Sequence, residues 1–177
     1  MRKILAGLLS IVGFGNAAAQ SPAPSPVQAT SELRSMVLAL KPGEIGLSPS
    51  ESPSRVWGVV METGMDRGYY TLVVLGDGTT SLYFSNGGGI IGAGERESVQ
   101  APSREFLAAG NQFAAAATPA TDTAPPRQGF TKFFLLTFDG LRTYTAPELA
   151  LVEEHDSLSP LFYAGQSVIT QLRLVQP

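Results

Sequence analysis

Two apolar runs separated by a glycine-rich turn constrain the fold of this chain most strongly. Residues 69–75 and 79–85 are rich in β-branched, aromatic and aliphatic side chains, which suit a pleated, buried surface. The Gly-Asp-Gly sequence at 76–78 supplies the positive-φ positions that a tight hairpin needs. A third dense apolar run at 56–62 precedes them, and consecutive strands with short connections favour an antiparallel meander.

A second strand region lies in the C-terminal half of the chain. Residues 130–139 form another dense apolar run, Asp139 and Gly140 signal a turn, and residues 141–145 are predicted to return as a short edge strand. The runs at 56–61 and 133–138 show no alternation of polar and apolar residues. We therefore expect a sheet that is covered on both faces.

Helical spacing of apolar residues predicts helices at 31–41, at 95–117 and from residue 159 onward, with one or two further turns at 147–154. Residues 170–175 also alternate, so the chain could end as helix or strand. The predicted fold is α+β: a single domain with a mainly antiparallel sheet of about five strands and helices on both faces. We expect the long helix on one face and the two terminal helices on the other. This layering is analogous to profilin-like and roadblock-like folds, and the analogy carries no function.

The first thirty residues have the order of an export signal and a linker. Arg2 and Lys3 are followed by an apolar stretch at 4–14 and then by three alanines, which predicts a signal peptide at 1–19 with cleavage between Ala19 and Gln20. The apolar stretch is too short for a stable membrane anchor. The Pro-rich residues 20–30 are predicted to be a linker, and residues 31–177 a single α+β domain. We expect the mature protein in the periplasm or outside the cell.

The glycine-rich segment at 86–94 satisfies the pattern G-x-G-x-x-G, but its context argues against nucleotide binding. No parallel strand–helix–strand unit surrounds it, and Glu95 and Glu97 would repel a phosphate. We interpret Asn86–Gly88 as a turn and Ile90 with Ile91 as a continuation of a buried strand. If this segment binds a ligand, the candidate residues are Asn86, Gly87, Gly88, Gly89 and Glu95.

Composition excludes several kinds of chemistry. The chain has no cysteine, and its net charge is −3, or −5 without Arg2 and Lys3, with no basic cluster for nucleic acid. His155 is the only histidine, and neither a G-x-S-x-G motif nor the spacing of a metal site is present. We predict no catalytic residues, no metal and no cofactor.

Three stretches of the chain resemble blocks of an uncharacterised family of small bacterial proteins. They are VWGVVMETG at 56–64, DGTTSLYFSNGGGIIGAGE at 77–95 and SPLFYAGQSVITQLRL at 159–174. The resemblance covers roughly residues 38–175 and leaves the signal and linker outside. It implies one domain, and it brings no activity, cofactor or site residue.

These patterns favour a non-catalytic exported module for binding or protein interaction, with a protein partner or a second copy of the chain as possible partners. One alternative is a hydrolase whose acid and base come from scattered carboxylates such as Glu62, Asp66, Glu95 and Asp139. Another alternative is a small-ligand sensor with a pocket near Asn86–Gly94.

Overall fold

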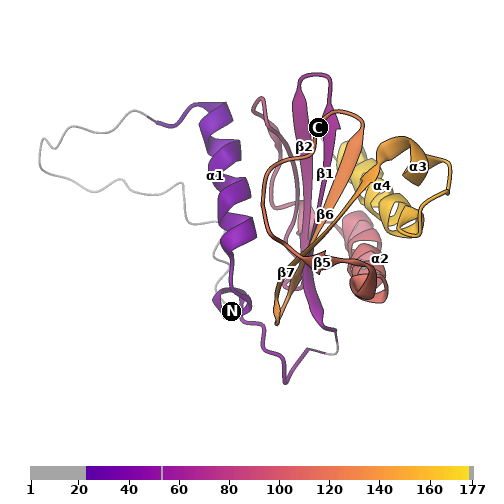
Figure 1. The fold of residues 1–177 in the computed structure, drawn as a ribbon. Helices are drawn as coiled ribbons and strands as arrows, with labels where there is room; N and C mark the ends of the chain where they lie inside the picture. The colour runs from indigo at the N-terminus through magenta and orange to yellow at the C-terminus, as the bar shows by residue number, and fades with distance from the viewer. Residues whose placement is uncertain (1–22, 53, 176–177) are drawn as a thin grey trace, which may run out of the picture.

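The structure, a computed structural model, describes residues 23–52 and 54–175 as one antiparallel sheet with helices on both faces (Figure 1). The strand order is β4-β3-β2-β1-β6-β7-β5. The predicted α+β class is confirmed, but the sheet has seven strands and not about five. The two additional strands, β4 and β5, are two residues long and lie at the edges. The predicted signal peptide and its cleavage site lie outside the described residues.

The five longer strands form the body of the sheet. Their bounds are β1 (Val56–Met65), β2 (Gly68–Leu75), β3 (Thr80–Phe84), β6 (Phe130–Thr137) and β7 (Gly140–Pro147), and the edge strands are β4 (Gly89–Ile90) and β5 (Thr118–Pro119). As predicted, β1, β2 and β3 pair in order as an antiparallel meander. Strand β7 is longer than the predicted edge strand, and β5 pairs with its outer side.

The α-helices are α1 (Pro26–Ala39), α2 (Glu97–Gln112), α3 (Glu148–Val152) and α4 (Ser159–Leu174), and the short 3-10 helices are Pro42–Ile45, Ala93–Glu95 and Ala114–Ala116. The predicted start of the first helix at residue 31 is wrong, because residues 26–30 are helical and do not belong to a linker. Ser25 caps the helix: its hydroxyl accepts from the backbone of Gln28, whose side chain accepts from the backbone of Ser25. Pro26 at the first helical position is compatible with this start, since that residue needs no N–H donor.

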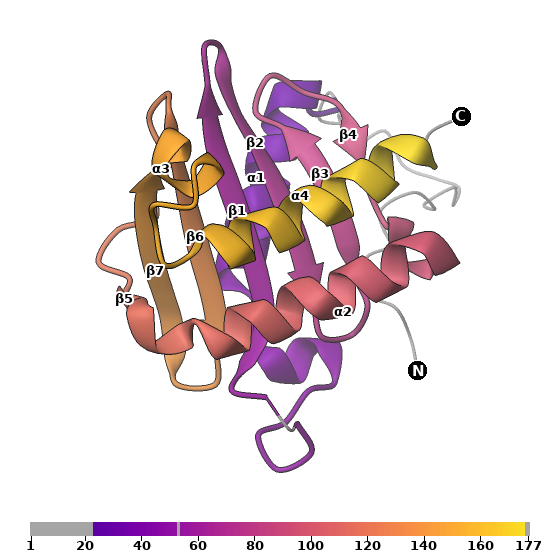
Figure 2. The same cartoon turned by 90° about the vertical axis from the view of Figure 1, so that its right-hand side faces the viewer.

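The distribution of helices over the two faces differs from the expected one. Helices α2 and α4 lie together across one face, and α1 lies on the other (Figures 1 and 2). Two glycines allow α2 and α4 to approach the strands: a Cβ on Gly110 would lie 2.4 Å from Val59, and one on Gly165 would lie 2.7 Å from Met61.

The apolar stripes identified the buried faces of α2 and α4. On α1 the predicted stripe is only partly buried, because Val37 is buried but Met36 is 53% exposed. The stripes did not specify which side of the sheet each helix would cover.

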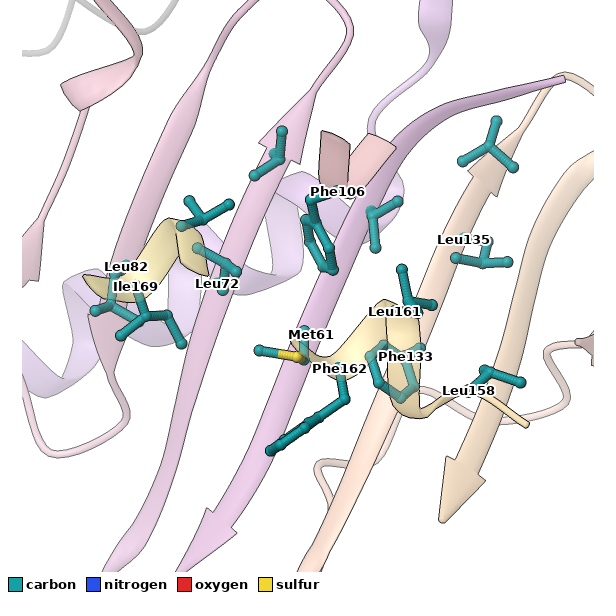
Figure 3. Close-up of a cluster of buried hydrophobic side chains, with 14 of the residues drawn as sticks. Met61, Leu72, Leu82, Phe106, Phe133, Leu135, Leu158, Leu161, Phe162 and Ile169 are labelled. Atoms are coloured by element: carbon teal, nitrogen blue, oxygen red, sulfur yellow. The ribbon is translucent and has the colours of Figure 1, made fainter. Parts of the chain in front are cut away.

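Each face of the sheet has its own apolar core. On the α2 and α4 side, Phe106 packs among Met61, Phe133 and Leu161 (Figure 3). On the α1 side the buried cluster contains Val37, Trp57, Val60, Val73, Leu75, Tyr83, Phe134 and Leu136. Helix α1 itself buries only Thr30 and Val37. Apolar contact alone therefore holds α1 less firmly than it holds α2 and α4.

Candidate functional site

A row of polar side chains crosses the middle of the sheet on the α1 side. Strand register places Tyr83 opposite Thr71, Thr71 opposite Glu62, Glu62 opposite Lys132, and Lys132 opposite Thr145. One residue from each of the five longer strands thus contributes to this polar row. Glu62 and Lys132 are buried although both are charged. Buried charges are costly unless they are paired, so their partners define the chemistry of this face.

Helix α1 contacts the polar row through the side chain of Arg34. Its Nε donates to Glu62 Oε1 at 2.7 Å, its Nη2 donates to Glu62 Oε2 at 2.9 Å, and the Thr71 hydroxyl also donates to Glu62 at 3.0 Å. The side chains of Arg34 and Glu62 are 11% and 0% exposed. Burial by itself would lower the pKa of Arg34. The hydrogen bonds to Glu62 and the negative charge of Glu62 outweigh burial, so the pKa of Arg34 is raised. The pair is therefore a buried, charged, two-pronged contact between helix and sheet.

The segment between β5 and β6 contacts Lys132, the cation of the polar row. Lys132 Nζ donates to Asp122 Oδ1 and to the carbonyl oxygen of Ala124, each at 3.0 Å. The hydrogen bond from Lys132 and the one from the backbone of Ala124 lower the pKa of Asp122. Arg34 Nη2 also donates to the carbonyl oxygen of Thr123. Asp122 and Ala124 thus contact the lysine of the sheet, and Thr123 between them contacts the arginine of α1.

Gly64 allows the same segment to approach β1 closely. A Cβ at this position would lie 2.2 Å from the carbonyl oxygen of Arg127, a distance that no side chain tolerates. The backbone of Gly129 donates to the carbonyl oxygen of Gly64 at 3.2 Å. The position of the segment beside the polar row therefore depends on a glycine in β1.

An open surface pocket of about 370 Å³, called the cavity below, lies at the Lys132 end of the polar row, and most of its lining residues are exposed. It is lined by Asp122, Ala124, Pro125, Pro126, Arg127, Phe130, Lys132 and Thr145. The guanidinium carbon of Arg127 lies 4.0 Å from the centre of the Phe130 ring, so the cation is stacked on an aromatic wall. The Lys132 side chain is 9% exposed, whereas that of Asp122 is 63% exposed. The cavity thus combines a buried ammonium group, a second cation at the surface and apolar walls.

The opposite end of the row, at Tyr83, offers much less room. The space between α1, β2 and β3 beside this tyrosine is about 20 Å³, enough for about one water molecule. Burial raises the pKa of Tyr83 well above its usual range, so the hydroxyl stays protonated. This hydroxyl has no hydrogen-bond partner among the described residues. Ile91, which follows β4, also lines this space, but none of the predicted ligand residues does.

The sequence-predicted ligand residues lie in and after the turn between β3 and β4. Asn86, Gly87 and Gly88 connect the two strands, Gly89 begins β4, and Glu95 ends the 3-10 helix at 93–95. The predicted turn is confirmed, since the backbone of Phe84 accepts from Gly87 and donates to Gly88. None of these five residues lines the 370 Å³ cavity.

The glycines of this turn have structural reasons for being glycine. Gly89 has a φ of 149°, and a Cβ there would lie 2.4 Å from the carbonyl oxygen of Leu82. A Cβ on Gly87 would lie 2.7 Å from Pro26, so the turn supports the start of α1. The predicted burial of Ile91 is wrong, because its side chain is 52% exposed. Strand β4 lies at the edge of the sheet and ends at Ile90.

The carboxylates of the hydrolase alternative do not form a cluster. Glu62 is bound by Arg34 in the middle of β1. Asp66 and Asp139 lie in turns at opposite ends of the sheet, because β1 and β6 are antiparallel. The side chain of His155 is 73% exposed and lies 3.4 Å from Glu153. Within the described part of the chain, no group of three or more His, Cys, Asp or Glu residues could hold a metal ion.

Sequence reasoning missed the pairing of Arg34, Lys132 and Asp122, although one signal was available. Glu62 and Lys132 are charged residues inside dense apolar runs, where a charge requires a partner. Their neighbours come from other strands and from a segment distant in sequence, so only the strand register reveals the row. Among the described residues, no helix is both long and apolar enough to cross a membrane. The chain matches no family model, no curated protein and no solved structure.

Proposed function

We propose that the protein is a non-catalytic exported binding module and that its ligand occupies the cavity beside Lys132. One observation carries this proposal: a nearly buried ammonium group in the wall of a cavity of about 370 Å³. An ammonium group has three N–H donors. Asp122 and Ala124 account for two of them within the described part of the chain. Lys132 Nζ also lies 5.0 Å from the centre of the Phe134 ring, a cation–π contact. Because Lys132 lines the cavity, we expect an anionic ligand there to contact its ammonium group.

The pairing of Glu62 with Arg34 supports a structural role for this carboxylate and not a role as general base. A general base needs a free lone pair within reach of a substrate proton. Both oxygens of Glu62 accept hydrogen bonds from Arg34, and the pair is buried between α1 and the sheet. Asp122 Oδ1 accepts from both Lys132 and the backbone of Ala124. The charges of the polar row therefore hold the fold in place around the cavity.

Export is part of this proposal and can be tested separately. Cleavage between Ala19 and Gln20 would leave only residues 20–25 before α1, so this helix would be the first element of the mature chain. We expect the intact mass of protein recovered from periplasm or culture medium to lack residues 1–19. Recovery of full-length protein only from the cytosol would contradict export.

The binding proposal is tested with a panel of small anionic, neutral and cationic compounds in thermal-shift and calorimetric assays. A ligand at a hundredfold excess over its Kd should stabilise the wild-type protein by about 2.7 kcal/mol. We expect the shift to be lost in Lys132→Met and to persist in Lys41→Met, which removes an exposed lysine outside the cavity. Equal binding by Lys132→Met, or no binding by any compound, would overturn the proposal.

A further inference from the structure

We infer that the cavity beside Lys132 takes a small monocarboxylate with an apolar body. This inference rests on the proposed binding function and goes further by naming the class of ligand. It depends on the charge of the lining, its hydrogen-bonding groups and its apolar residues.

The lining carries one positive charge in excess. Lys132 and Arg127 contribute two cations, and Asp122 contributes one carboxylate. Glu62, the carboxylate opposite Lys132 in the sheet, does not restore neutrality because Arg34 already pairs with both of its oxygens. A monoanion would neutralise the cavity, whereas a dianion would leave it with excess negative charge.

Hydrogen-bonding groups of the wall match the two oxygens of a carboxylate. The ammonium group of Lys132, which lines the cavity, can donate to one oxygen. Thr145 lies opposite Lys132 on β7 and also lines the cavity, so its hydroxyl is a second polar group on the same wall. The guanidinium group of Arg127 supplies further donors at the exposed side. Hydrogen bonds between charged partners are about twice as strong as neutral ones, so these groups favour a carboxylate over an amide.

The remaining walls favour an apolar body. Pro125, Pro126 and Phe130 line the cavity, with the guanidinium group of Arg127 over the Phe130 ring. A volume of about 370 Å³ is at the low end for small-molecule pockets, which run from about 300 to 1,000 Å³. A compact ring or short chain with one carboxylate fits these walls better than an extended peptide does.

The test uses benzoate as the probe, benzamide as its neutral isostere and inorganic phosphate as a multiply charged anion. Isothermal titration calorimetry and backbone amide NMR are applied to the whole mature chain. We expect benzoate to bind about tenfold or more tightly than benzamide, with the largest amide shifts at Ala124 and Phe130. Inorganic phosphate is expected to bind more weakly than benzoate.

Variants separate a charge effect from a structural effect. Lys132→Met is expected to abolish benzoate binding, and Arg127→Gln, at an exposed position, to weaken it about tenfold. Asp122→Asn raises the net charge of the lining to two positive charges and is expected to tighten benzoate binding, which a merely structural loss would not do. Lys41→Met is the matched control and should bind as the wild-type protein does.

Different results identify which proposal fails. Benzamide binding as tightly as benzoate, phosphate binding more tightly, or Asp122→Asn weakening benzoate would overturn the carboxylate assignment. In those cases a different ligand bound in the cavity and lost in Lys132→Met would still support the binding function. If no compound of the wider charge panel binds either, both proposals fail. Arg127→Gln and Asp122→Asn keep the test decisive should Lys132→Met fail to fold.

Discussion

Arg34→Met is expected to lower the free energy of unfolding by about 3–5 kcal/mol, because it leaves the carboxylate of Glu62 buried without its cation. Glu62 is fully buried beneath α1, and the Thr71 hydroxyl at 3.0 Å would be its one remaining side-chain hydrogen-bond donor among the described residues. The cost of the unpaired carboxylate falls only if water can reach it. Since α1 buries only two of its side chains, we expect this helix to leave the sheet in the variant.

Trp57 provides the measurement for this variant. It is the only tryptophan of the chain, and it is 4% exposed in the core on the α1 side. Departure of α1 should shift its fluorescence to longer wavelength before global unfolding, and urea titration gives the change in stability. Arg104→Met removes an exposed arginine of α2 and should change stability by less than about 0.5 kcal/mol.

A double variant isolates the charge contribution. Arg34→Met with Glu62→Gln removes both charges, so it should be less destabilised than Arg34→Met alone, in which the carboxylate keeps its charge. An Arg34→Met protein within about 0.5 kcal/mol of the wild type would show that the ion pair does not hold α1 on the sheet.

Phe106→Ala is the second substitution with a large expected effect, a loss of about 3–5 kcal/mol in the free energy of unfolding. Phe106 is fully buried on α2, in the same core as Met61 of β1 and Leu161 of α4 (Figure 3). The ring is held among close neighbours: a Cβ on Gly165 of α4 would lie 3.1 Å from it. Removal of the ring should leave a void that these neighbours cannot fill, because two helices and the sheet meet there.

Thermal and urea unfolding measure this loss. Leu149→Ala is the matched control, since Leu149 is 66% exposed on α3 and its truncation should cost less than about 0.5 kcal/mol. Phe106→Leu should fall between the two, as it retains part of the buried volume. If Phe106→Ala and Leu149→Ala were equally stable, the core between α2, α4 and the sheet could not be packed as described.

The sequence by itself determined the class of the fold and the approximate positions of its longer strands and helices. Alternation and density of apolar residues identified β1, β2, β3 and β6, since each strand must bury its side chains on a pleated surface. The helical stripe beginning at Ser159 correctly indicated α4, although its last residues were ambiguous. The start of α1 at Pro26 was missed because the prolines before it suggested a linker, while the capping pair of Ser25 and Gln28 was overlooked.

Only the tertiary structure decided which helices share a face and which polar residues meet. An apolar stripe reports that a helix is buried, but both faces of this sheet are apolar, so either could have received α4. Glu62 and Lys132 became neighbours through the register of β1 with β6, and Arg34 and Asp122 reached them from segments distant along the chain. The glycines at 87–89 form the turn between β3 and β4. The cavity lies near the other edge of the sheet. No local sequence pattern indicated it, because the energy of pairing buried charges depends on which residues the fold brings together.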